Sequence, residues 1–171
     1  MNVNAKLKAS FAKWAIYSFL LMLMLVLQNT LSLHISNICL VLPAVVVISL
    51  NDDTDVGLVL GGVFGMLWDV TSGTIFGYNA LMMLIFAFAS QIVAANLIHV
   101  KWLTNLITVA AFAAVYQVIT YLFFFLIWGN GGAWYTIFRA IFRGSLSAAI
   151  TGTLIFFIFR LIGRKLNSPA Q

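Results

Sequence analysis

Apolar segments fill the chain almost without interruption from Trp14 to Ile162. Of the 171 residues, 63% are hydrophobic and only 8% are charged, so a soluble fold would expose large apolar patches. The hydrocarbon core of a bilayer is the solvent that suits such a surface, and a helix needs about 20 apolar residues to cross it. The sequence therefore predicts an all-α integral membrane protein that forms one polytopic domain.

Short polar breaks divide this sequence into six predicted transmembrane helices in one bundle. Their approximate bounds are 14–33, 38–50, 56–70, 78–98, 102–128 and 144–163. The second segment is short, and Pro43 near its middle predicts a kink. The start of the sixth segment is open, because residues 134–143 fit either the outer interface or the bilayer.

Basic residues predict the orientation of the helices in the cell membrane. Of nine Lys and Arg residues, seven lie on the predicted cytoplasmic side, which are Lys6, Lys8, Lys13, Lys101, Arg160, Arg164 and Lys165. Because such charges resist translocation, both termini are predicted to be cytoplasmic. The acidic turn 52–55 then lies inside, as a solvated turn rather than a cation site, and the glycine-rich turn 129–132 lies outside.

The net charge of +5 has consequences for partners. The basic residues do not form a continuous groove, so nucleic acid is not predicted as a partner. They lie at the ends of the predicted helices, where we expect them to contact lipid headgroups.

Small residues recur every four positions in the third predicted helix, at Gly57, Gly61 and Gly65, and the same spacing leads to Asp69. At about 100° per residue, steps of four drift by only ~40°, so these positions share one slowly winding face. In lipid, such a face lets another helix approach closely. Two interpretations are open: packing against this chain's own helices, or binding of a partner protein.

A second stripe of small residues, Gly144, Ala148 and Gly152, has the same spacing in the last predicted helix. Two smooth helix faces in one bundle can pack against each other. We therefore expect this stripe to face the first.

Asp69 is the one carboxylate well inside an apolar segment. A charged Asp at the centre of a bilayer costs ~2.5–3.5 kcal/mol, so it needs a partner. Arg143 reaches a similar predicted depth from the other end of its helix, with Arg139 one turn before it. The sequence suggests an ion pair between Asp69 and Arg143, with Arg139 as the second candidate.

Catalytic residues are not predicted. A serine nucleophile needs a histidine at matching depth, whereas Ser72 lacks such a context and His34 and His99 lie at the ends of predicted helices. Cys39 is the single cysteine, so it builds neither an intrachain disulfide nor a cysteine-based metal centre. The sequence predicts no enzyme activity, no cofactor and no metal.

One run of residues resembles the rod shape-determining protein MreD family. It consists of Gly57, Gly61, Gly65, Asp69, Ser72, Gly73 and Gly77, followed by Asn79. The resemblance implies a non-enzymatic scaffold of the bacterial cell-wall elongation machinery. It also implies a partner, an MreC-like bitopic membrane protein, and through it MreB filaments, RodA and its transpeptidase.

The same resemblance implies a fold similar to the substrate-binding subunits of energy-coupling-factor vitamin transporters. Such a subunit is the alternative function, and it would need aromatic and polar groups around an outward-facing cavity. Four aromatic residues lie near the predicted outer side, namely Trp68, Tyr78, Trp134 and Tyr135. The first predicted helix lacks the Ala-xxx-Ala face that those subunits present to their transporter core, which favours the scaffold.

Overall fold

The computed structural model describes residues 3–32, 39–51, 55–96, 102–128 and 134–166, and these are helical apart from short turns. Six helices follow one another along the chain: α1 (Val3–Ser32), α2 (Val41–Asn51), α3 (Val56–Ser72), α4 (Tyr78–Asn96), α5 (Trp102–Trp128) and α6 (Trp134–Leu166). The all-α class predicted from the sequence is confirmed for the described residues.

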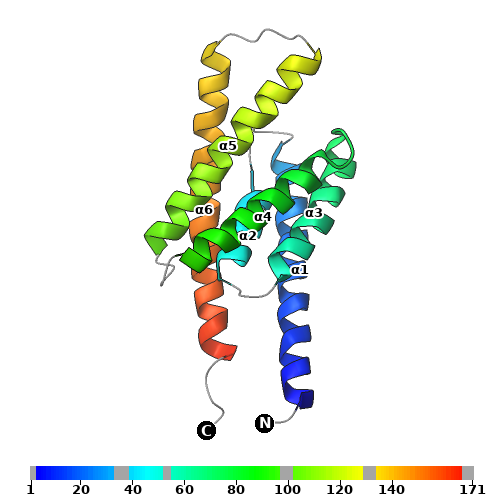
Figure 1. The fold of residues 1–171 in the computed structure, drawn as a ribbon, viewed down its shortest axis with the longest axis vertical. Coiled ribbons are helices and arrows are strands. Elements are labelled where there is room, and N and C mark those ends of the chain that lie inside the picture. The colour runs from blue at the N-terminus through cyan, green and yellow to red at the C-terminus, as the bar shows by residue number, and fades with distance from the viewer. Residues whose placement is uncertain (1–2, 33–38, 52–54, 97–101, 129–133, 167–171) are drawn as a thin grey trace.

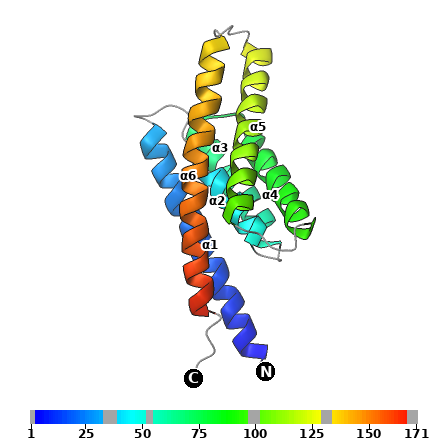
Figure 2. The same cartoon turned by 90° about the vertical axis from the view of Figure 1, so that its left-hand side faces the viewer.

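Successive helices alternate in direction along the long axis of the molecule (Figure 1). The first turn of α1 and the last turn of α6 lie at the same end, as a view turned by 90° also shows (Figure 2). Four helices contain a segment long and apolar enough to cross a membrane, which are Lys13–Leu31, Tyr78–Asn96, Trp102–Phe123 and Ile141–Ile158. These lengths and compositions are those of a membrane protein.

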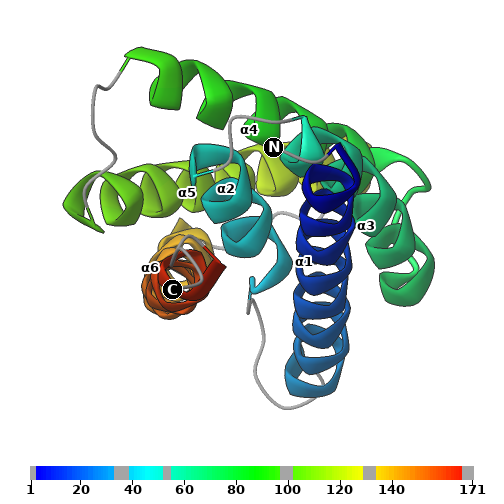
Figure 3. The ribbon, with the colours of Figure 1, turned by 90° about the horizontal axis from the view of Figure 1, so that it is seen from below.

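The shortest helix, α2, lies at the centre of the fold. It contacts each of the five other helices, and its residues from Val41 to Leu50 are all buried. Viewed from below, α2 lies between α1 and α6 (Figure 3). Since α6 contacts only α2 and α5 among the described residues, α2 is the main link between the α5–α6 pair and the other helices.

Side chains from two distant helices satisfy the backbone at the start of α2. The Oε1 atom of Gln28 on α1 accepts hydrogen bonds from the backbone N–H groups of Leu40 at 2.7 Å and Val41 at 3.0 Å. The Oγ atom of Ser147 on α6 accepts one from the N–H of Cys39 at 3.4 Å. The first N–H groups of a helix have no intrahelical acceptor, so these side chains replace water in the interior.

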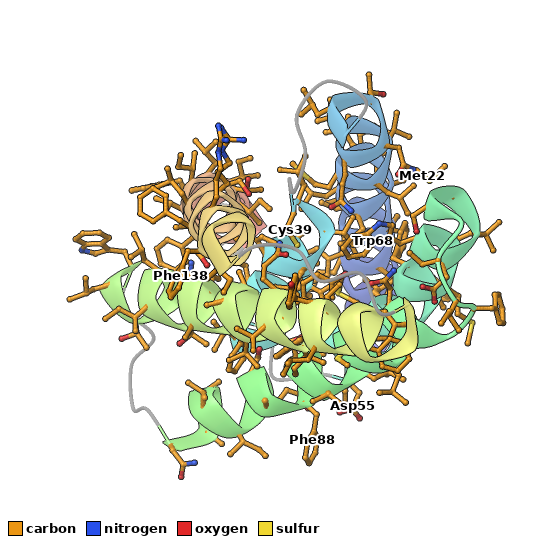
Figure 4. The ribbon with its side chains drawn as sticks, turned by 90° about the horizontal axis from the view of Figure 1, so that it is seen from above. Met22, Cys39, Asp55, Trp68, Phe88 and Phe138 are labelled. Carbon is orange, nitrogen blue, oxygen red and sulfur yellow. The ribbon has the colours of Figure 1, made fainter. Side chains whose placement is uncertain are left out.

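Two further residues lie at the start of α2. Cys39, just ahead of the helix, is buried and lies near the centre of the molecule in Figure 4. Pro43 has no N–H and suits the first turn of a helix. The predicted kink at Pro43 is therefore wrong, because α2 begins at Val41 and Pro43 lies in its first turn rather than near its middle.

Two helices extend beyond the apolar segments predicted for them. Helix α1 begins at Val3, ahead of Trp14, and α6 is continuous from Trp134, ahead of Gly144. Hydropathy detects the part of a helix that lies in lipid, whereas backbone hydrogen bonds carry the helix further. The predicted turn 129–132, residues 52–54 of the acidic turn, and residues 33, 38, 97 and 98 of the predicted spans lie outside the described residues.

Replacing Gln28 tests the cap on α2. Gln28→Met keeps the size of the side chain but leaves two buried N–H groups without an acceptor, at a cost of about 1–3 kcal/mol each. We expect a clear fall in the thermal unfolding midpoint in detergent. Gln91→Met is the matched control, because the partly buried side chain of Gln91 makes no hydrogen bond within the described residues. Equal midpoints for the two variants would contradict this role of Gln28.

Candidate functional site

The glycine face of α3 is buried against this chain's own helices. Gly57, Gly61 and Gly65 are all buried. A Cβ atom on Gly65 would lie 2.5 Å from the Cα of Ala80 on α4, and one on Gly61 would lie 3.0 Å from Cγ1 of Val45 on α2. The structure therefore uses these three glycines for internal packing, the first of the two interpretations left open by the sequence.

The second stripe faces a different helix from the one predicted. Gly144, Ala148 and Gly152 are buried, and a Cβ atom on Gly152 would lie 2.8 Å from Cγ1 of Val109 on α5. Described residues of α3 and α6 make no contact. The expectation that the two stripes face each other is wrong, because adjacent helices α5 and α6 pack together and use the second stripe between themselves.

The carboxylate of Asp69 holds the start of α4. Asp69 is 1% exposed, and its Oδ2 accepts hydrogen bonds from the backbone N–H groups of Gly77 at 2.9 Å and Ala80 at 3.4 Å. Its Oδ1 accepts from the N–H of Asn79 at 3.0 Å and from the hydroxyl of Thr74 at 3.0 Å. Asp69 is thus a cap supplied by the preceding helix, and its negative charge complements the dipole of α4.

Two glycines allow the chain to turn back so sharply between α3 and α4. Gly73 ends α3 in the left-handed region with φ at 65°, and Gly77 has φ at 90°. Residues with a Cβ rarely adopt these angles. The hydroxyl of Ser72 donates to the carbonyl of Trp68 at 2.7 Å, which satisfies one acceptor of the last turn of α3. Ser72, Gly73 and Gly77 therefore shape the turn that Asp69 holds.

The predicted ion pair between Asp69 and Arg143 does not form among the described residues. Asp69 accepts its four hydrogen bonds from α4 and the turn before it, and α3 does not contact α6. Arg139 and Arg143 are both exposed. The expectation is corrected because backbone N–H groups, a few residues ahead in the chain, supply the positive partner that Asp69 requires.

A chain of hydrogen bonds connects this turn to α5. The side-chain Nδ2 of Asn79 donates to the hydroxyl of Thr74 at 3.1 Å. The hydroxyl of Tyr116 donates to Oδ1 of Asn79 at 2.6 Å. The ring of Tyr116 lies 5.8 Å from that of Trp68. Sequence reasoning missed Thr74 and Tyr116, although a threonine between two glycines after a buried carboxylate is a usable signal.

Two of the aromatic residues considered for a ligand cavity make contacts between helices. Trp68 is adjacent to Tyr116, and the hydroxyl of Tyr78 donates to that of Thr120 at 2.9 Å. The side chains of Trp134 and Tyr135 are not among those that the structure describes. Among the described residues, no group of three His, Cys, Asp or Glu side chains is placed to hold a metal ion.

Together these residues form one unit, which we call the Asp69 turn and define as Asp69, Ser72, Gly73, Thr74, Gly77 and Asn79. Its carboxylate, hydroxyl and amide groups bond one another or the backbone. These bonds fix the start of α4 relative to the end of α3.

Two neighbouring glycines of α3 provide a matched test of the close contact with α4. Gly65→Ala forces a Cβ against the backbone of Ala80, and we expect it to lower the free energy of unfolding by about 1–3 kcal/mol. Gly62→Ala meets only the side-chain end of Leu84 at 3.4 Å, so it should keep or raise stability through its better helix propensity. Thermal unfolding in detergent measures both. The reverse order would refute the packing assigned to Gly65.

Graded changes at Asp69 test the cap. Asp69→Asn keeps one acceptor oxygen but turns an amide donor toward backbone donors, and Asp69→Leu removes every acceptor. We expect stability to fall in that order, by about 2–4 kcal/mol for Asp69→Leu. Arg143→Leu should leave stability almost unchanged, since Arg143 is exposed. If Arg143→Leu lowered the stability as much as Asp69→Leu, this result would contradict the cap and indicate an ion pair between the two residues.

No protein-family model, curated protein or solved structure matches this chain. The resemblance to the MreD family therefore stays a prediction, and it rests on the residues from Gly57 to Asn79.

Proposed function

We propose that this protein is a non-enzymatic membrane scaffold of the bacterial cell-wall elongation machinery that maintains rod shape. It binds an MreC-like bitopic membrane protein and, through it, associates with MreB filaments, RodA and its transpeptidase. Its mechanism is positional: it holds wall synthesis and cytoplasmic filaments in one assembly and performs no reaction itself.

One observation supports the proposal most directly: the residues on which the resemblance to the MreD family is based pack or hydrogen-bond together in the structure. Gly57, Gly61 and Gly65 bring α3 against α2 and α4, and the Asp69 turn then fixes the start of α4. A sequence pattern that marks a family is expected to consist of residues that its fold requires. The structure gives each of these positions such a requirement, which supports the assignment.

The arrangement of the helices supports a six-span bundle in the cell membrane with both termini in the cytoplasm. The helices alternate in direction, and α1 begins at the end where α6 finishes (Figure 1). Basic residues from Lys6 to Lys13 and from Arg160 to Lys165 lie in those two helix ends, as the positive-inside rule requires of the cytoplasmic side. With 11 residues, α2 is about 16 Å long and is the shortest of the six helices.

A scaffold needs outer surfaces that a partner helix can contact. Helix α1 contacts only α2 and α3 among the described residues, and it exposes large side chains along its other side, including Phe19, Met22 and Val26. In lipid, packing between helices rather than hydrophobic burial drives association. Such a free side suits a single-span partner, which is what an MreC-like protein offers.

Affinity purification from native membranes tests this function against the transporter alternative. The expected result is recovery of an MreC-like protein without a bound vitamin, compared with an unrelated multi-pass protein that carries the same tag. Recovery of an ATPase-coupled transporter core would overturn the proposal. Depletion from a rod-shaped cell should widen or round the cell, and rods of normal width after complete loss would equally contradict the scaffold.

A further inference from the structure

The two arginines near the start of α6 form no ion pair with an acidic side chain among the described residues. The whole sequence contains four acidic residues, Asp52, Asp53, Asp55 and Asp69. Asp69 is buried and bonded to α4. Asp55 is the N-cap residue of α3, whose first turn lies near the middle of the long axis of the molecule, well below the first turns of α6 (Figure 1), and Asp52 and Asp53 lie outside the described residues. No acid of the described residues neutralises Arg139 and Arg143, so another molecule can supply that charge.

The two guanidinium groups lie at the edge of the apolar part of α6. The segment able to cross a membrane begins at Ile141, so Arg139 precedes it and Arg143 lies just inside it. From Arg143 to Arg160 the helix rises about 25 Å, close to the thickness of the hydrocarbon core. In a bilayer that this segment crosses, Arg139 and Arg143 would lie at the depth of the lipid headgroups.

The pair and its flanks have the shape of a lipid site. Residues four apart lie one turn apart on the same helix face, and both arginines are exposed. Phe138 and Phe142, which immediately precede them, are 69% and 70% exposed. The exposed face continues along α6 through Leu146 and Ile150. An apolar strip of this kind, with two cations at one end, matches an acyl chain below a charged headgroup.

We propose that Arg139 and Arg143 form a binding site for the phosphate of an anionic phospholipid, with Phe142 and Leu146 against its acyl chain. Each guanidinium presents a planar fork of N–H donors that fits phosphate oxygens, and the phosphate of a phospholipid has two non-bridging oxygens, one for each guanidinium. The inference requires insertion in a membrane but not the scaffold function.

Photocrosslinking from position 142 tests the site directly. The photoreactive residue benzoylphenylalanine replaces Phe142 in protein reconstituted into phosphatidylcholine vesicles that contain a minority of phosphatidylglycerol, and mass spectrometry identifies the lipid adducts. We expect phosphatidylglycerol to be enriched about fivefold over its bulk share, the effect of about one charge contact at the membrane surface. The variant R139Q/R143Q should return the share to its bulk value.

Two controls separate a site from general attraction. Benzoylphenylalanine at Phe88, which is 58% exposed on the outer side of α4 (Figure 4), should report the bulk share in both backgrounds. R139K/R143K keeps the charges but removes the forks, so its enrichment should lie between those of the native pair and R139Q/R143Q, and it also shows that the substituted protein folds.

Three outcomes would overturn the proposal. They are a bulk lipid share at position 142, an enrichment that persists in R139Q/R143Q, and, in native membranes, adducts with a protein in place of lipid. The crosslinking uses vesicles that contain no other protein, so its result does not depend on an MreC-like partner. Failure to recover such a partner in the affinity purification would therefore count against the scaffold alone.

Discussion

The start of a helix is the most demanding feature of this fold, because its first N–H groups have no acceptor of their own and the surroundings are apolar. Helices α2 and α4 both meet this demand with a side chain from a preceding helix. Gln28 on α1 accepts from the backbone of Leu40 and Val41, and Asp69 on α3 accepts from Gly77, Asn79 and Ala80. An unsatisfied group in hydrocarbon costs several kilocalories, so these two caps decide where α2 and α4 can begin.

The positions of these caps in turn require close contacts between helices. For Asp69 to reach the start of α4, the chain must reverse within a few residues, which Gly73 and Gly77 permit through positive φ angles. Helix α4 then returns along α3 at a separation that leaves no room for a Cβ at Gly65. The glycine face and the carboxylate are thus two parts of one constraint: the carboxylate fixes the start of α4, and the glycines allow α4 to continue beside α3.

Much of this fold can be predicted from the sequence, and the failures have a common cause. The helices follow from hydropathy, and the Gly57 to Gly65 spacing correctly indicates a close approach by another helix. The sequence also indicates that Asp69 needs a partner, yet Arg143 is the wrong choice. Matching of charges favours a side chain of opposite charge, such as Arg143, as the partner of Asp69. The actual donors are mainly backbone N–H groups, which almost every residue has, so the sequence pattern does not distinguish them. Pro43 fails similarly, since a start at Val41 depends on Gln28 and Ser147, which are distant in sequence.

The use of Asp69 inside the protein also determines what its surface can do. With that carboxylate bonded to α4, it makes no ion pair with α6 within the part of the chain that the structure describes, and Arg139 and Arg143 remain exposed. The polar groups of the Asp69 turn are likewise bonded to one another or to the backbone. The interior is held together by its own polar groups, whereas the outer surface has exposed arginines and apolar helix faces. These properties suit the proposed role, in which the protein binds lipids and partner helices and holds them in place.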